Sequence, residues 1–383
     1  MLFRSLMTSH NPNLDIYKTD PVLGLQRTTV PIPGGVTAHL VAVADIVASG
    51  AGPHGAQDSR AEIAIIERDP ATYASKLHVF AFVFDGAGSL HRITPDDGIG
   101  VGLNASSIAT GDVSGTERAD VVVTAADSDE LHIFTEQSGG VGPVIGSPFS
   151  TYAGPRGASV GNALAQFSGN EIVICNAGRP DAPVTVKNIS IYSGVGEYRG
   201  SFDTVGVGQA NVAYDSAIAN VLHDTDRAEV IVALRSDPTT DVVSATSSIN
   251  VFSQSAGGNL LDTGVGQPQV YETGANFETS VVKTGDVTGD GRQEIVVGNS
   301  GKWMRFGAKQ APSLQIFSSA DGTTLLTHDP LWSTGVEQAS GIETTGTVLG
   351  AAPSVIVANL GPLGPSRHPI DAGRSEEHTS ELQ

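Results

Sequence analysis

The stretch DVVVTAADSDELHIF, residues 120–134, contains two kinds of short segment that recur along the chain. The first, DVVVT at Asp120, is an acid followed by β-branched residues, a composition that favours a buried strand. The second, LHIF at Leu131, alternates apolar and polar residues and closes on an aromatic residue, which also indicates a strand. The stretch therefore predicts two consecutive strands joined by a short loop.

Both kinds of segment occur in six copies at intervals of about sixty residues, and such internal repetition is the strongest signal in the sequence. The aromatic segments are LDIY at Leu14, LHVF at Leu77, LHIF at Leu131, ISIY at Ile189, INVF at Ile249 and LQIF at Leu314. The β-branched segments are EIAII at Glu62, DVVVT at Asp120, EIVIC at Glu171, EVIVA at Glu229, EIVVG at Glu294 and SVIVA at Ser354. Glycine-rich segments, such as GIGVG at Gly98 and GVGQ at Gly206, precede several of them and suit tight turns.

A repeat of about sixty residues with four predicted strands fits one blade of a β-propeller. A β-solenoid would have a shorter period and a row of sandwich domains a longer one. The sequence predicts an all-β propeller of four-stranded blades, with about six blade equivalents of a seven-bladed ring that is truncated at both ends. The expected blades are residues 37–97, 98–154, 155–205, 206–263 and 264–334, with half-blades at 6–36 and 335–373.

Both ends of the chain look like translated sequencing adaptors. These are MLFRS, residues 1–5, and RSEEHTSELQ, residues 374–383. Residues of this origin belong to no fold, so we expect both segments to pack against nothing. The chain between them is then an internal piece of a longer gene, and neither a targeting signal nor the true termini can be observed in it.

Composition and charge restrict the partners of this chain. The formal net charge is −20, a field that repels nucleic acid and anionic lipid and attracts cations. No apolar run approaches the roughly 20 residues that span a bilayer, so no membrane insertion is expected within this chain. The single cysteine, Cys175, excludes a disulfide framework and is expected to be a buried, inert thiol. We expect a monomer.

The segment GDVTGDGRQEIVVG, residues 285–298, is the best candidate for a metal-binding loop. Its oxygen donors fall at alternate positions, namely the side chains of Asp286, Thr288, Asp290 and Glu294 and the carbonyl of Arg292. Alternate residues of a tight loop can point inward at a hard cation such as calcium. No helix is predicted beside the loop and its closing acid comes at position nine, so an EF-hand is not expected. The alternative is an acidic turn that contacts only water.

At these residues the chain resembles the FG-GAP, or VCBS-like, β-propeller repeat family of the integrin α-subunit type. Blades of that family carry a D-x-[DN]-x-D-G-x-x-D loop that holds calcium between their first two strands. Asp286, Asp290 and Gly291 match this pattern, whereas Thr288 departs from it and Glu294 replaces the closing aspartate. The resemblance implies a propeller with structural Ca²⁺ bound at the edge of the ring.

Other copies of the loop are less complete. A weaker second candidate for a calcium loop is GDVSGTERAD, with Asp112, Ser114, Thr116, the Arg118 carbonyl and Asp120, but Glu117 stands where the pattern has glycine. Two further loops contain scattered oxygen or nitrogen donors, which are Asn220, Asp224, Asp226 and Glu229 in one and Asp45, His54, Asp58 and Glu62 in the other. For all of these loops the prediction is an acidic turn that contacts water.

No catalytic motif is present in the sequence, and the histidines are scattered. His78 and His132 hold the second position of two aromatic segments, so we expect them on a polar strand face, with hydrogen bonds at the surface or between blades.

Two loops are expected at the propeller rim, where ligands are met. SGKWMRFG at Ser300 is the candidate ligand-binding loop, with Lys302, Trp303 and Arg305, and ERDPATYASKLHVF from Glu67 takes the equivalent place in its own blade. Trp303 is either exposed for a sugar ring or a carboxylate, or packed against the neighbouring blade.

The sequence leads to one functional hypothesis and two alternatives. The hypothesis is a non-catalytic, extracellular or cell-surface calcium-binding propeller that presents rim loops to a protein or glycan, as an adhesion or recognition module. The alternatives are the propeller domain of a carbohydrate-active enzyme, such as a polysaccharide lyase, and a lectin. An enzyme would show converging charged groups in one deep cleft, and a lectin would show similar shallow sites in several blades.

Overall fold

The computed structural model describes residues 5–6, 12–20, 24–47, 61–83, 89–138, 140–164, 166–178, 188–204, 210–222, 228–236, 246–253, 268–275, 277–287, 291–301, 314–319, 325–327, 339–345 and 354–359. Within these ranges the chain is mostly extended, and the single helical segment is the short turn η1, Pro33–Gly35. No helix among the described residues has the length and hydropathy needed to span a bilayer.

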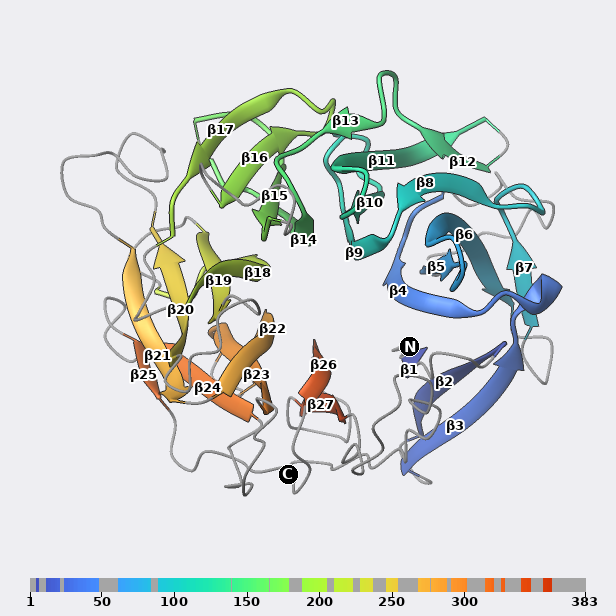
Figure 1. Cartoon of the computed structure of the whole chain (residues 1–383). Helices are drawn as coiled ribbons and strands as arrows, with labels where there is room; N and C mark the ends of the chain where they lie inside the picture. The colour runs from blue at the N-terminus through green and yellow to red at the C-terminus, as the bar shows by residue number, and fades with distance from the viewer. Residues whose placement is uncertain are drawn as a thin grey trace. The chain divides into compact units, whose positions relative to one another are not determined.

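The chain divides into two compact units, each built from antiparallel sheets whose strands follow one another in sequence (Figure 1). We name each sheet after its first strand. In the first unit the β1 sheet consists of β1 (Ser5–Leu6), β2 (Asn13–Asp20) and β3 (Gly24–Pro31). The β4 sheet has β4 (Ala38–Ala44), β5 (Glu62–Arg68), β6 (Ala74–Val83) and β7 (Ser89–Arg92) in that order. The β9 sheet has β9 (Ala105–Gly111), β10 (Asp120–Ala125), β11 (Glu130–Gln137) and β12 (Gly140–Pro143), and the β14 sheet has β14 (Pro155–Gly161), β15 (Glu171–Asn176), β16 (Ile189–Ser193) and β17 (Tyr198–Phe202).

The second unit repeats the same arrangement. The β18 sheet has β18 (Ala210–Ala219), β19 (Glu229–Ser236), β20 (Thr246–Phe252) and β21 (Gln269–Ala275) in order. The β22 sheet has β22 (Phe277–Gly285), β23 (Glu294–Gly301), β24 (Leu314–Ser319) and β25 (Leu325–Thr327). The β26 sheet has two described strands, β26 (Ala339–Thr345) and β27 (Ser354–Asn359).

The outer edge of two sheets contains an additional short strand. β8 (Ile99–Leu103) pairs with β6 beside β7, and β13 (Phe149–Ser150) pairs with β11 beside β12. The glycine segment GIGVG therefore contributes β8 to the edge of the β4 sheet before the chain enters β9. Two of its glycines are left-handed, Gly98 with φ of 71° and Gly102 with φ of 77°, and a Cβ at Gly98 would also lie 2.5 Å from the His78 ring.

The expectation for the first residues of the chain is wrong at Ser5. Ser5 and Leu6 form β1, in which Ser5 pairs with Ile16 of β2. Strand pairing uses backbone groups that every residue other than proline carries, so an unusual side-chain sequence does not prevent it. The other suspected adaptor residues, 1–4 and 374–383, lie outside the described residues.

Apolar clusters fill the spaces between consecutive sheets within each unit. On β10, Val121 and Val123 join the cluster shared with the β4 sheet, whereas Val122 joins the cluster shared with the β14 sheet. In the second unit, Ile231 of the β18 sheet and Ile295 of the β22 sheet belong to one cluster. First strands also contact one another, since β9 touches β4 and β14, and β22 touches β18 and β26. The central strands are buried on both faces, which explains their continuous β-branched runs.

Burial on both faces contradicts the expected polar face of the aromatic strands. Among the side chains that the structure describes, the polar residues at their second position are buried, namely His78, His132, Ser190, Asn250 and Gln315. Several of these residues form a hydrogen bond within their own sheet: His78 to Glu67 at 3.1 Å, His132 to Glu130 at 3.2 Å, and Ser190 from Asn176 at 3.0 Å. An alternating pattern predicts one solvated face only when nothing covers the sheet, whereas here a neighbouring sheet covers it.

The fold is thus all-β and of the β-propeller type, with four-stranded antiparallel blades that follow one another along the chain, and this confirms the expected fold class. The number of blades in the ring stays a prediction. The aromatic residues that close the third strands are buried, namely Phe80, Phe134, Tyr192, Phe252 and Phe317. Cys175 is also buried, in β15, as expected.

Candidate metal-binding loops

The candidate loops connect the first strand of a sheet to the second. In each loop, the acid that begins the second strand pairs with the last residue of the first strand. These pairs are Ala44 with Glu62, Gly111 with Asp120, Gly161 with Glu171, Ala219 with Glu229, and Gly285 with Glu294. The acid therefore marks the point where the loop closes, and all five acids are buried.

The buried acid holds the start of the loop through backbone N–H groups. Asp120 Oδ2 accepts from the N–H groups of Val113 and Ser114, both at 2.8 Å. Glu229 Oε2 accepts from Val221 at 2.8 Å and from Leu222 at 3.2 Å.

The same contact recurs in two more sheets. Glu62 Oε2 accepts from Ile46 at 2.7 Å and from Val47 at 3.2 Å, and Glu294 Oε2 accepts from Val287 at 2.8 Å. A carboxylate that accepts backbone N–H groups satisfies donors that would otherwise be buried without a partner. The recurring acid is thus a structural residue, and sequence reasoning missed this role. The signal was available, because the acid recurs at the start of five of the six β-branched segments.

The loop at Asp112 closes on itself through hydrogen bonds. Asp112 accepts the N–H groups of Gly115 at 2.7 Å, Thr116 at 3.1 Å and Glu117 at 2.9 Å. The Ser114 hydroxyl donates to Asp120 Oδ1 at 3.0 Å and lies 3.2 Å from the Thr116 hydroxyl. Gly115 and Glu117 are both left-handed, with φ of 76° and 64°. Donors within the loop therefore occupy the carboxylates that were predicted as weaker calcium ligands.

The loop at Asp286 is described at its two ends. Asp286 Oδ2 accepts the Gly291 N–H at 3.0 Å, across five residues, and Gly291 is left-handed with φ of 85°. A left-handed φ favours glycine at this position of the turn. Glu294 closes the loop through Val287, as above. Thr288 and Asp290 lie outside the described residues.

The oxygen donors of the Asp286 loop are of the type that calcium prefers. In the described part of the chain no group of three or more His, Cys, Asp or Glu side chains could hold a metal ion. The described donors of the loop are the Asp286 and Glu294 carboxylates and the Arg292 carbonyl, and the two other predicted ligands belong to the segment 288–290. The residues fit calcium in chemistry, and a calcium site here stays a prediction.

The two arginines predicted to contribute carbonyl ligands use their side chains to tie the loops to other segments. Arg118 Nη1 contacts both carboxylate oxygens of Asp45 at 2.6 Å, and the Ala119 N–H donates to the Asp45 carbonyl at 2.8 Å. Asp45 follows β4, so this ion pair joins the loops of two consecutive sheets. Arg292 Nη1 donates to the Ser319 carbonyl at 3.2 Å.

Among the loop acids, Glu62 has a shifted pKa. Burial raises the pKa of the Glu62 carboxyl, and the N–H groups of Ile46 and Val47 partly offset that increase. The nearby negative charge of Asp45 also raises the pKa of Glu62.

Of the remaining predicted donors in these loops, His54, Asp58, Asp224 and Asp226 lie outside the described residues.

Of the two predicted rim loops, one is described. Lys302, Trp303 and Arg305 lie outside the described residues, so the candidate ligand loop stays a prediction. The equivalent loop from Glu67 is a tight turn between β5 and β6. In it, the Asp69 carboxylate accepts the N–H groups of Ala71 at 2.7 Å and Thr72 at 3.0 Å, and these N–H groups lower the pKa of Asp69.

Three buried or half-buried histidines have lowered pKa values. Burial lowers the pKa of His39 from 6.5 to about 4, and the nearby Arg68 charge lowers it further, against a hydrogen bond to the Ala105 backbone that raises it. Burial also lowers the pKa of His78 and His132, although Glu67 and Glu130 oppose it.

The His39 shift leads to a testable pH dependence. Below about pH 6.5 His39 binds a proton in the unfolded chain, whereas in the folded chain its lower pKa keeps it neutral down to about pH 4. The free energy of unfolding therefore falls as the pH drops from 6.5 towards 4. We expect His39→Gln to remove on the order of 1–2 kcal/mol of this loss, allowing for partial exposure of the ring. Urea denaturation at pH 7, 5.5 and 4.5 measures the effect, and parallel curves for the two proteins would contradict it.

No protein-family model matches the chain. No curated protein matches it either. Among solved structures, it is similar to a fructofuranosidase from Schwanniomyces occidentalis complexed with fructose, with 12% identity and a TM-score of 0.39 over 75% of this chain. It is also similar to AztD from Citrobacter koseri, with 11% identity and a TM-score of 0.38 over 92% of this chain and 74% of AztD. The chain spans 61% of the fructofuranosidase. At TM-scores below 0.5, neither likeness carries an argument about function.

Proposed function

We propose that this chain is a non-catalytic, calcium-binding propeller module that presents rim loops to a protein or glycan. Calcium acts structurally in the Asp286 loop, where it neutralises clustered acids and fixes the turn between β22 and β23. The observation that carries the proposal is the backbone turn at Gly291. There, Asp286 reaches across five residues to the Gly291 N–H while Glu294 closes the other side.

The Asp112 loop supports this choice by contrast. Its two carboxylates accept hydrogen bonds from within their own loop, three at Asp112 and three at Asp120. It also has Glu117 where the calcium pattern has glycine, whereas the Asp286 loop has Gly291. We therefore assign calcium to the Asp286 loop and not to the Asp112 loop.

The proposed location is extracellular or at a cell surface. A single calcium loop of modest affinity suits the millimolar calcium found outside cells better than cytosolic concentrations. The net charge of −20 favours cations and disfavours nucleic acid as a partner. We propose that the chain acts as a monomer.

Calcium is expected to stabilise the protein. A ligand that binds only the folded state at about 100 times its Kd adds about 2.7 kcal/mol, which raises the melting temperature visibly. Magnesium should do less, because it requires a tighter octahedron and releases water reluctantly. Thermal melts in EDTA, in millimolar magnesium and in millimolar calcium measure the increments.

Two variants locate the effect. Asp290→Ala should abolish most of the calcium increment. Asp112→Ala is the matched control: it should lower the melting temperature in EDTA, since three N–H groups lose their acceptor, yet keep the calcium increment. Identical melts of the unmodified chain in EDTA and calcium would reject the metal assignment.

A further inference from the structure

The residue before the third strand is left-handed in two consecutive sheets. Tyr73, just before β6, has φ of 59°, and Asp129, just before β11, has φ of 55°. Aspartate tolerates this conformation, whereas a bulky aromatic residue there is a real outlier that costs about 1–2 kcal/mol. The left-handed backbone therefore explains why an aspartate is found at position 129. It does not explain why a tyrosine is found at position 73.

Burial does not explain Tyr73 either, because its side chain is 49% exposed. An aromatic residue held in a strained conformation with half its surface in water recovers little hydrophobic free energy. Strained residues that the surrounding structure nevertheless maintains concentrate at functional sites. The Tyr73 ring is thus a candidate contact surface for a ligand.

Polar groups surround the ring in a fixed arrangement. The Arg68 guanidinium carbon lies 5.8 Å from the centre of the Tyr73 ring, and Arg68 Nη1 donates to Asn104 Oδ1 at 2.8 Å. Asn104 is itself left-handed, with φ of 55°, and its N–H donates to the Tyr73 carbonyl at 2.7 Å. The Asn104 side-chain amide donates to Asp127 at 3.2 Å.

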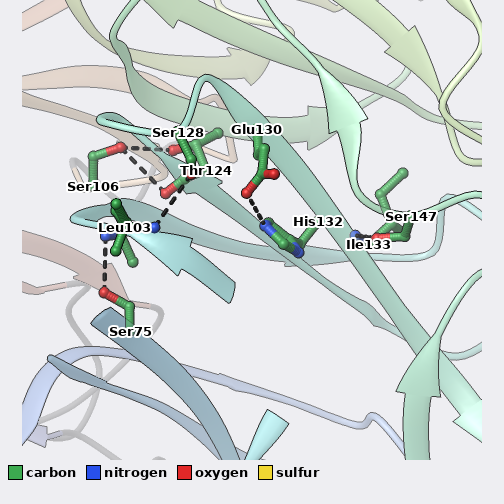
Figure 2. A network of polar contacts seen from close by, with 10 residues as sticks. Ser75, Leu103, Ser106, Thr124, Ser128, Glu130, His132, Ile133 and Ser147 are labelled. Carbon is green, nitrogen blue, oxygen red and sulfur yellow. Dashed lines mark hydrogen bonds and ion pairs between the residues drawn. The ribbon is translucent and has the colours of Figure 1, made fainter. Parts of the chain in front are cut away.

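Hydrogen bonds also fix the backbone of the turn that contains Tyr73. The Tyr73 N–H donates to the Asp69 carbonyl at 2.9 Å, within the turn that the Asp69 carboxylate caps. Leu103, which precedes Asn104, is 44% exposed, and its N–H donates to the Ser128 hydroxyl at 3.2 Å. Figure 2 draws this hydrogen bond. The site therefore needs little ordering when a ligand arrives, which favours affinity.

The chemistry of this surface matches a sugar ring. The exposed face of Tyr73 can cover the C–H groups on one side of a hexopyranose, while the Arg68 guanidinium and the Asn104 amide offer directional hydrogen bonds to its hydroxyls. Asp69 follows Arg68 in the chain, Asp127 accepts from the Asn104 amide, and the chain carries −20, so an anionic ligand is disfavoured. We propose that Tyr73, Arg68 and Asn104 bind a hexopyranose unit of a neutral glycan. This inference rests on the proposed recognition function, within which it specifies the ligand class.

The test is native affinity electrophoresis of the whole chain in gels that contain neutral β-glucan, galactomannan or xyloglucan, with polygalacturonate as the anionic comparison. The unmodified chain should be retarded in at least one neutral gel. Tyr73→Asn, which suits a left-handed position, should weaken that retardation at least tenfold without lowering the melting temperature. Tyr198→Asn is the matched control, because Tyr198 is 47% exposed but lies in β17, and it should keep the retardation.

The other outcomes separate this site from the proposed function. Equal retardation of the unmodified chain and Tyr73→Asn would overturn the Tyr73 site and leave glycan recognition in place. Retardation by polygalacturonate alone would overturn the neutral ligand class. An unretarded native chain in every gel would overturn both the site and glycan recognition.

Discussion

Replacing Asp120 by alanine is expected to lower the free energy of unfolding by about 2–4 kcal/mol. Asp120 is 1% exposed, and its carboxylate accepts the Val113 and Ser114 N–H groups and the Ser114 hydroxyl. Alanine leaves these donors without their acceptor in a place that water reaches poorly, and each such loss costs about 1–3 kcal/mol. Urea denaturation at pH 7 measures the change.

Two companion variants make the result specific to the carboxylate. Asp120→Asn keeps one acceptor oxygen and should lose less stability than Asp120→Ala. Glu117→Ala removes an exposed acid from the same loop and should change stability by less than about 0.5 kcal/mol. If Asp120→Ala were no more destabilising than Glu117→Ala, the structural role assigned to the recurring acid would be wrong.

The Phe134→Ala variant is expected to lose about 3–5 kcal/mol, the largest effect among these substitutions. Phe134 closes the third strand of the β9 sheet, is 1% exposed, and belongs to the cluster between that sheet and the β4 sheet. Truncation removes a buried ring and leaves a cavity between two sheets that cannot collapse fully. Chemical denaturation with intrinsic fluorescence and circular dichroism measures the loss.

Phe134→Leu is the control for this substitution. A leucine fills most of the same space, so we expect a loss of less than about 1.5 kcal/mol. Similar stabilities for the alanine and leucine variants would show that the aromatic residue does not hold the two sheets together.

The candidate site could be predicted only in part. The position of each loop was predictable, because the acid and the β-branched run recur at a fixed place in the repeat. The structural function of the acid could not be predicted. Glu229 and Asp120 match the pattern of possible metal ligands, yet both accept backbone N–H groups from residues six to eight positions earlier. Such contacts depend on where the loop backbone passes, which no spacing of side chains specifies.

The sequence by itself determined the strand types, their repeat and the four-stranded blade, because a period of two and a period of about sixty residues are both properties of the linear chain. Only the tertiary structure decided which faces are buried. His78 and His132 look like surface residues in an alternating strand, but a second sheet covers them and each pairs with a glutamate. It also decided that Tyr73 is left-handed, half exposed and beside Arg68, since Asn104 of a distant segment supports both residues. Local patterns specify what one strand prefers, whereas burial and ligand contacts arise only when separate repeats pack against one another.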